Sequence, residues 1–286
     1  MNKINLLIAF FAQLVITSCS NSNSGEKPLT DSTTVIPEIT DTVATTVNDI
    51  VRFKFDFAMG NTPSPAEVVN DMSTYKLVYN SAYLSDVAKV NSFKTDFSKA
   101  LNLGMYNLDM AYAIANAQGA DVLKYLKTSM SEINALGMKT AFDQFIGKRT
   151  ETNINNKDSL LTIIDEMYVK GDSYLRTNQR VETATYIFIG SWIEALHIIC
   201  STGKDEKDAV QKARIRKLLW DQRFYLKNII DLLEEFKSSK EAVGLRADLF
   251  KIHSEIDALA EPKDITEEKF KAICALITEE RNKLSK

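Results

Sequence analysis

Apolar residues recur at steps of three and four along most of the chain after residue 63, which is the spacing of one helix face. Helices are predicted at 93–115, 120–136, 139–148, 206–237, 245–259 and 270–284. The sequence Ser64-Pro65-Ala66-Glu67 combines a capping box with proline at the first helical position, so another helix begins there. The pattern predicts an all-α fold over residues 63–286, as a bundle or antiparallel array of about seven to nine helices.

Residues 158–201 carry the longest apolar seam, and it runs without a change of register. Because unbroken helices of this length are uncommon in compact domains, we expect a break at 176–180 and an antiparallel pair; one continuous helix is the alternative. Within the seam, residues 186–200 are apolar almost all round, and Glu194 is the only charged residue among them. A helix without a polar face is normally the central helix of a bundle.

Residues 19–62 are predicted to form an extended tether in front of this helical domain. The part up to residue 48 is rich in Ser, Thr, Asn and Asp and has no helical period, which is typical of a disordered segment spanning about 30–35 Å. Phe53, Phe55 and Phe57 then alternate with polar residues, which predicts an extended strap. These phenylalanines would fill a groove in the body, or the strand would pair with the sheet edge of a partner.

The first nineteen residues have the order of an export signal. Lys3 is followed by an apolar run from Ile4 to Ile16, which is too short to span a bilayer. The run ends in Ile16-Thr17-Ser18-Cys19, which resembles the lipobox of bacterial lipoproteins: an aliphatic residue, two small residues and the cysteine that receives the lipid. The resemblance implies that residues 1–18 are a signal peptide and that Cys19 is acylated, with palmitate among its chains. The alternative is an ordinary signal peptide cleaved nearby.

The lipoprotein resemblance also implies a location. The protein would be held to a membrane of the cell envelope through its lipid anchor. Ser20 occupies the position where an acidic residue often marks retention in the inner membrane, so the outer membrane is favoured, on its periplasmic or its external face. Only residues 1–19 carry the resemblance, and the remainder of the chain indicates no family.

The net charge and the cysteines indicate which classes of protein are excluded and how the core is held together. The formal net charge is only −3, and no concentrated basic face is visible, which excludes a typical nucleic-acid binder. Cys200 and Cys274 both lie in apolar helical stretches. Because a chain of this size can build its core without cross-links, we favour buried free thiols over a disulfide.

The sequence contains few candidates for catalytic, metal-ligating or ligand-binding residues. Glu194 and His197 form a Glu-x-x-His step, which di-iron bundles use twice, but the chain has only two histidines and His253 lacks the matching glutamate. No metal and no cofactor are therefore expected. We interpret Glu194 and His197 as an internal polar pair, satisfied by each other or by a tyrosine such as Tyr112 or Tyr174. The alternative is a ligand pocket that also includes Asp109.

The sequence alone therefore predicts a lipid-anchored helical protein of the cell envelope that binds or scaffolds and has no evident catalytic centre. Its partners would be the membrane, through Cys19, and a protein or polymer of the envelope, but no nucleic acid. The alternative function is binding of a small molecule or cofactor in an interhelical pocket near Glu194, His197, Asp109 and Tyr112.

Overall fold

The computed structural model describes residues 47–74, 78–142 and 146–286, which belong to the second of the two units into which the chain divides. All described regular elements are helices, so the fold class is all-α, as predicted. The α-helices are α1 (Val47–Gly60), α2 (Pro65–Thr74), α3 (Asp96–Ala115), α4 (Gly119–Ala135), α5 (Ile146–Thr152), α6 (Lys157–Thr177), α7 (Val181–Asp205), α8 (Ala209–Leu233), α9 (Lys240–Asp257) and α10 (Glu267–Leu284). Short 3₁₀ helices are η1 (Ser81–Tyr83), η2 (Val87–Asn91), η3 (Lys139–Ala141), η4 (Glu234–Phe236) and η5 (Pro262–Asp264).

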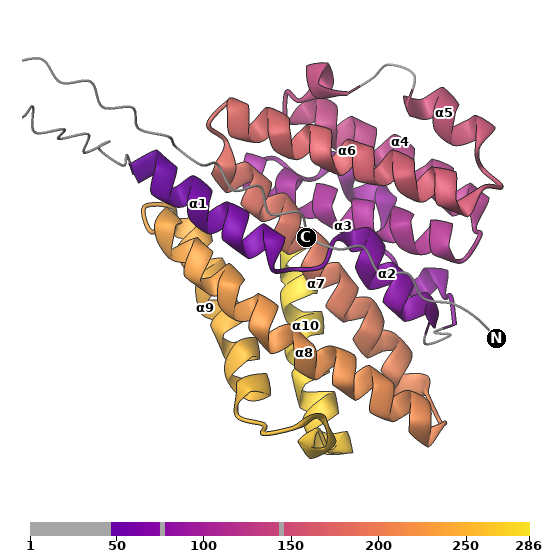
Figure 1. The fold of residues 1–286 in the computed structure, drawn as a ribbon, viewed down its shortest axis with the longest axis vertical. Coiled ribbons are helices and arrows are strands. Elements are labelled where there is room, and N and C mark those ends of the chain that lie inside the picture. Colours follow the sequence, from indigo (N-terminus) through magenta and orange to yellow (C-terminus); the bar gives the residue numbers. More distant parts are fainter. Residues whose placement is uncertain (1–46, 75–77, 143–145) are drawn as a thin grey trace, which may run out of the picture. The chain divides into compact units, whose positions relative to one another are not determined.

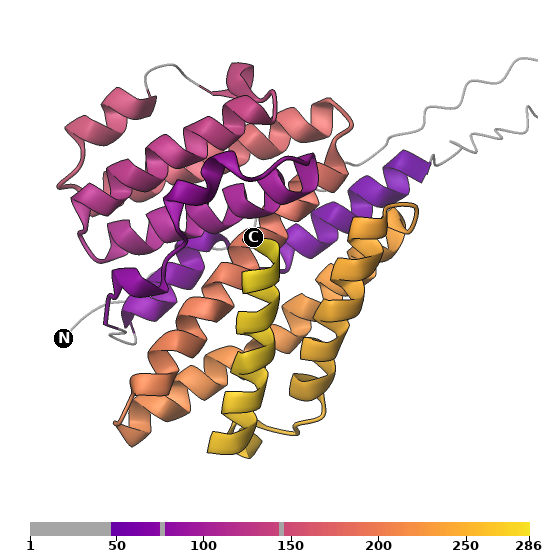
Figure 2. The same ribbon diagram turned by 180° about the vertical axis from the view of Figure 1, so that it is seen from behind.

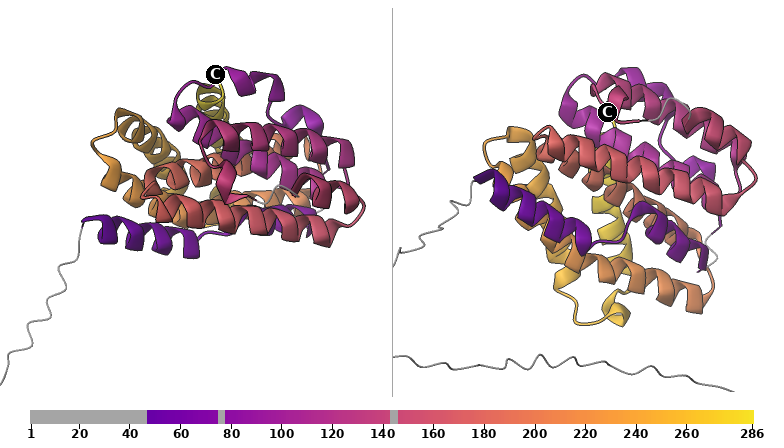
Figure 3. Two further views of the ribbon diagram at one scale, coloured as in Figure 1. Left: turned by 90° about the horizontal axis from the view of Figure 1, so that it is seen from above. Right: turned by 45° about the horizontal axis from the view of Figure 1, so that its top comes forward.

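The other helices pack around the pair α3 and α7. On one side α4 and α6 lie against the pair, with α5 beyond them, and on the other side α8, α9 and α10 form a second group (Figure 1). The reverse view shows α10, in yellow, lying along α7 (Figure 2). The indigo helices α1 and α2 cover one face of both groups, and α1 contacts α7 and α8 while α2 contacts α3 and α7 (Figure 3).

The long apolar seam is broken where we expected it. α6 ends at Thr177 and α7 begins at Val181, and Gln179 adopts a positive φ of 58° in the turn between them. Every residue from Ala184 to Gly203 is buried except His197, which is partly exposed. In the described residues α7 alone is long and apolar enough to cross a bilayer, but 89% of its apolar window is buried in the body. It is the central helix of the fold.

α3 and α7 approach each other until their backbones touch. A Cβ atom on Gly104 would lie 1.9 Å from the carbonyl oxygen of Ile187, and one on Gly190 would lie 1.9 Å from that of Leu101. The hydroxyl of Ser191 donates a hydrogen bond of 2.9 Å to the carbonyl of Gly104 across this contact. Two glycines, one on each helix, thus set the distance between the central helices, as small residues do in tightly packed helix pairs.

The prediction of an extended, phenylalanine-rich strap is wrong, because this segment is helix α1. The alternation of phenylalanines coexists with a helical apolar stripe of Phe55, Ala58 and Met59, and this stripe packs against the core. In a helix, residues two apart point in very different directions. Phe55 is therefore 1% exposed, whereas Phe53 and Phe57 are 69% and 54% exposed on another face.

Helix α1 also changes the domain boundary and the helix count. The described body includes α1 from Val47, ahead of residue 62, and the described residues contain ten α-helices where about seven to nine were predicted. The capping box before α2 is confirmed: the amide of Ser64 donates to the Glu67 carboxylate (2.7 Å), and the amide of Glu67 donates to the Ser64 hydroxyl (3.2 Å). The helix predicted at 139–148 is divided between η3 and α5.

The expectation of free thiols is also wrong. Cys200 of α7 and Cys274 of α10 are both fully buried and form a disulfide, with their Cα atoms 5.4 Å apart. Each cysteine lies in an apolar helical stretch, and this local pattern does not reveal that α7 and α10 pack side by side. The disulfide links the central helix to the last helix of the chain.

The close contact at Gly190 predicts that adding one methyl group there strongly destabilises the fold, whereas the same change at an open glycine does not. We expect Gly190→Ala to reduce the free energy of unfolding by about 3 kcal/mol or more, since the added Cβ collides with backbone and forces α3 and α7 apart. Gly244 lies in α9 with nothing within 4 Å of its Cβ position, so Gly244→Ala is the matched control. It should be neutral or stabilising by about 1 kcal/mol. Urea denaturation followed by circular dichroism measures both; equal stabilities of the two variants would contradict the contact.

Candidate functional site

A buried ion pair joins α7 to α10 at the residues that the sequence singled out. Both carboxylate oxygens of Glu194 accept hydrogen bonds from Arg281, one from Nε and one from Nη2, each of 2.9 Å. The Glu194 side chain is 0% exposed and that of Arg281 is 12% exposed. This two-point contact is the strong form of an arginine–carboxylate pair. It occupies both oxygens of the only charged group on the apolar part of α7.

Asp109 of α3 lies next to this pair and is also fully buried. Its Oδ2 accepts a hydrogen bond of 2.9 Å from the amide of Ser85, and Arg281 Nη2 donates one of 3.1 Å to the Ser85 hydroxyl. Burial, followed by the negative charge of Glu194, raises the pKa of Asp109 well above its ordinary range. Burial in this cluster of Asp109, Glu194 and Arg281 thus favours the protonated form of Asp109.

Two tyrosines hold the segment around Ser85 over the cluster. Tyr125 of α4 donates a hydrogen bond of 2.9 Å to the carbonyl of Ser85, and Tyr106 of α3 donates one of 3.2 Å to that of Asp86. Burial raises the pKa of both hydroxyls, so they remain protonated donors. The segment is therefore fixed by α3, α4 and α10 together.

The structure does not bring all four predicted pocket residues into one group. Asp109 and Glu194 are neighbours, but Tyr112 donates a hydrogen bond of 3.1 Å to the carbonyl of Val78 and stacks on Tyr79 at a centroid distance of 5.1 Å. His197 is hydrogen-bonded to the backbone of Tyr83, and burial lowers its pKa, with the charge of Glu194 opposing the shift. Burial therefore favours the neutral form of the His197 imidazole.

The expected pairing of Glu194 with His197 or a tyrosine is wrong, because both oxygens of Glu194 are bound by Arg281, a residue that the sequence analysis did not single out. The sequence of the last helix does indicate that Arg281 is largely buried. Arg281 follows Cys274 and Ile277 at helical spacing and so places a charge in line with buried apolar residues of α10. A charge in that position predicts an internal partner. Among the described residues, no group of three metal-ligating side chains is placed to hold an ion.

Another buried carboxyl lies between α3 and α4, and it has no ion pair among the described residues. Glu132 of α4 is 1% exposed, and neither of its oxygens has a hydrogen-bond partner in the structure. Burial raises its pKa from 4.5 to about 7, and the positive charge of Lys99 on α3 opposes the shift. Tyr106 of α3 also faces it, since the charge of Glu132 contributes to the raised pKa of that tyrosine.

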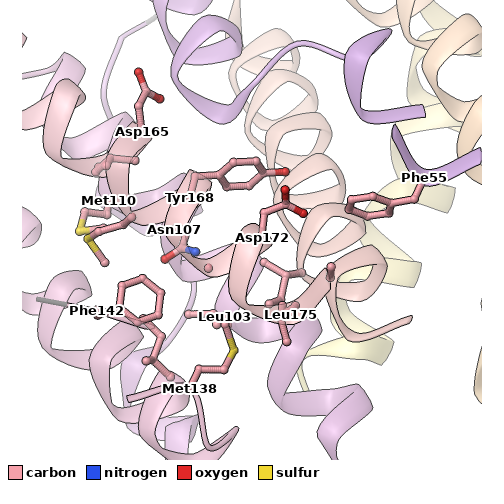
Figure 4. A pocket seen from close by; sticks show the side chains of 16 residues that line it. Phe55, Leu103, Asn107, Met110, Met138, Phe142, Asp165, Tyr168, Asp172 and Leu175 are labelled. Carbon is pink, nitrogen blue, oxygen red and sulfur yellow. The ribbon is translucent and has the colours of Figure 1, made fainter. Parts of the chain in front are cut away.

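Two hollows lie away from these charged groups. One is a narrow apolar cavity of about 40 Å³ enclosed by α1, α3, α4, α6 and α7, shown in Figure 4. The other is an open groove of about 370 Å³ beside α1, lined by Phe53, Lys54 and Phe57 and by residues of α8, η4 and α9. No family model matches the chain, and neither the curated proteins nor the solved structures contain a match. Function must therefore be inferred from this geometry.

We expect the Glu194–Arg281 pair to show strong coupling in a double-mutant cycle. Arg281→Met leaves a buried carboxylate without its partner and should cost about 3–5 kcal/mol of unfolding free energy. Combining it with Glu194→Gln removes that charge, so the double variant should be more stable than Arg281→Met alone. Urea denaturation at pH 7 measures all three variants. Additive losses would show that the two side chains do not interact.

The raised pKa of Glu132 predicts that the free energy of unfolding decreases with rising pH. The folded state binds this proton more tightly than the unfolded state, so the free energy of unfolding falls as pH rises from 4.5 to about 7. The total loss is about 3 kcal/mol, and it should disappear in Glu132→Gln. Asp109 adds a slope of the same sign, so the test is the difference between wild type and variant. Parallel stability curves from pH 4 to 8 would refute the role of Glu132.

Proposed function

We propose that this chain is a lipid-anchored, non-catalytic binding protein of the bacterial cell envelope, which docks a protein partner in the groove beside α1. The observation that carries the proposal is the pair of exposed phenylalanines on that helix. Phe53 and Phe57 are one helical turn apart and line the groove together with Leu232 of α8. Exposed aromatic groups gathered in a hollow are typical of interface anchors.

The charges around the groove indicate the chemistry of the partner. Lys54 is ion-paired with Glu235, and Arg246 is paired with Glu234 at 2.9 Å. Because positive and negative side chains are already paired there, the groove offers no excess charge to an anionic polymer. An apolar segment of a protein, such as one face of a helix, fits the two phenylalanines and the balanced rim.

The amino-terminal sequence supports the anchor, although Cys19 lies outside the described residues. α1 is the first described helix after Cys19 in the sequence. The groove is therefore formed partly by the helix that is nearest to the proposed anchor along the chain. The disulfide between Cys200 and Cys274 supports export, because disulfides persist in oxidising compartments. Outer-membrane attachment remains the favoured location on the basis of Ser20.

A small-molecule site at Glu194, His197, Asp109 and Tyr112 is the less favoured function. Arg281 already binds both oxygens of Glu194, and Tyr112 and His197 are bonded to the backbone of the 78–83 segment. A ligand there would first have to displace a buried ion pair, which is costly.

One experiment tests the anchor and the groove separately. Wild type should be recovered from the membrane fraction with a stoichiometric partner, and Cys19→Ala should become soluble but keep that partner. Phe53→Ser combined with Phe57→Ser should remain membrane-bound and lose the partner, because the apolar anchors are gone. Phe250→Ser is the matched control: Phe250 is 55% exposed, close to the 54% of Phe57, but does not line the groove.

The outcomes distinguish the two halves of the proposal. Cys19→Ala remaining in the membrane fraction would overturn the lipid anchor. Loss of the partner in Phe250→Ser to the same extent as in the double variant would overturn the groove as the docking site. Fractionation, quantitative mass spectrometry of the captured proteins and a circular dichroism check of folding supply the measurements.

A further inference from the structure

A third hollow continues the groove beside α1. It has a volume of about 460 Å³ and lies at the corner between α1 and α2, next to α8. The groove is lined by Phe57 of α1 and Asn228 of α8, and the hollow is lined by Asn61 and Tyr225, each about one turn further along the same two segments. Asn61 Nδ2 also donates a hydrogen bond of 2.7 Å to the carbonyl of Phe57, so the two linings are in direct contact. The groove and the hollow therefore form one trough along α1 and α8, which pack side by side (Figure 1).

The two ends of the trough differ in charge. At the groove end, Lys54 and Arg246 are already paired with carboxylates. At the hollow end, Glu67 and Asp71 of α2 belong to a lining without a basic side chain, and neither is ion-paired within the described part of the chain. Like charges four residues apart slightly destabilise a helix. The hollow therefore carries negative charge that the body itself does not neutralise.

Tyr225 lies beside these two carboxylates. Burial and then the negative charge of Asp221 raise the pKa of its hydroxyl, and Lys217, which is ion-paired with Asp221, opposes the shift. The charges of Asp71 and Glu67 raise this pKa as well, so both α2 carboxylates lie close to the tyrosine. An aromatic ring next to carboxylates suits a guanidinium or ammonium group, which can stack on the ring and pair with the oxygens.

We propose that the trough binds a helical segment of a protein partner, with apolar side chains on Phe53 and Phe57 and arginine or lysine side chains in the hollow beside Tyr225. From Phe53 to Asn61 the trough covers about 12 Å at 1.5 Å per residue, so the basic side chains lie about two turns from the first apolar anchor. A segment with acidic residues at those positions is repelled. This inference rests on the proposed function, because it names the chemistry of the partner that docks in the same groove.

Two synthetic peptides of sixteen residues are the probes, titrated calorimetrically into the purified Cys19→Ala chain. Both are capped, helical and carry three leucines on one face. One has two arginines on each side of the leucines, so that either orientation places a pair in the hollow, and the other has glutamines in these positions. At low salt the arginine peptide should bind about fivefold more tightly. This advantage should shrink in about 0.5 M sodium chloride, which screens exposed charges.

Two matched variants locate the charge effect. Glu67→Gln combined with Asp71→Asn removes both carboxylates and should abolish the preference for the arginine peptide. Glutamine can keep the capping box, in which Glu67 accepts from the amide of Ser64. Glu255→Gln combined with Asp257→Asn removes two exposed charges from α9, outside the trough, and should leave the preference unchanged.

The outcomes separate this inference from the proposed function. Equal affinity of wild type for the two peptides, binding of neither at millimolar concentration, or an unchanged preference in the Glu67 and Asp71 variant would overturn the basic partner. An equal loss of preference in the α9 control would overturn it as well. Phe53→Ser combined with Phe57→Ser should weaken both peptides alike, since the leucines lose their contacts. If that weakening occurs while the two peptides bind wild type equally, the groove stands and only the basic partner is wrong.

Discussion

The backbones of α3 and α7 touch at Gly104 and Gly190, and the rest of the body depends on that contact. A helix that is apolar all round must be covered on every side. α7 meets this requirement because α3 lies against it at backbone distance, α6 and α8 flank it, and α10 is joined to it by the Cys200–Cys274 disulfide. The close approach also determines which polar groups can meet in the interior.

The buried charges follow from the same geometry. Asp109 on α3 and Glu194 on α7 are neighbours only because these two helices are so close, and two buried carboxyls cannot both ionise beside one arginine without a large cost. Arg281 pairs with Glu194, and burial beside Glu194 favours the protonated form of Asp109. A buried pair of this kind is weak evidence for net stability, since apolar side chains of similar volume often replace such pairs at no loss. Its clearer effect is to fix the position of α10 relative to α7.

The periodicity of the sequence predicted the all-α class, the central position of α7, the break after α6 and the capping box of α2. It failed at α1, because Phe53, Phe55 and Phe57 alternate like a strand while Phe55, Ala58 and Met59 also form a helical stripe. It could not predict the disulfide or the Glu194–Arg281 pair, whose members are separated by 74 and 87 residues. Such contacts depend on which helices pack together, and local spacing contains no information about that.

The apolar cavity and the groove both include residues of α1, and this limits how an occupant of one could influence the other. Phe55 faces the cavity, whereas Phe53 and Phe57 face the groove. Exposed ion pairs such as Arg176–Asp56 contribute little to holding α1 in place, so the buried Phe55 and its apolar neighbours supply most of that stabilisation. An occupant of the cavity alters the groove only if it binds one position of α1 better than another. Without that difference in affinity, the inner and outer faces of the same helix act as independent sites.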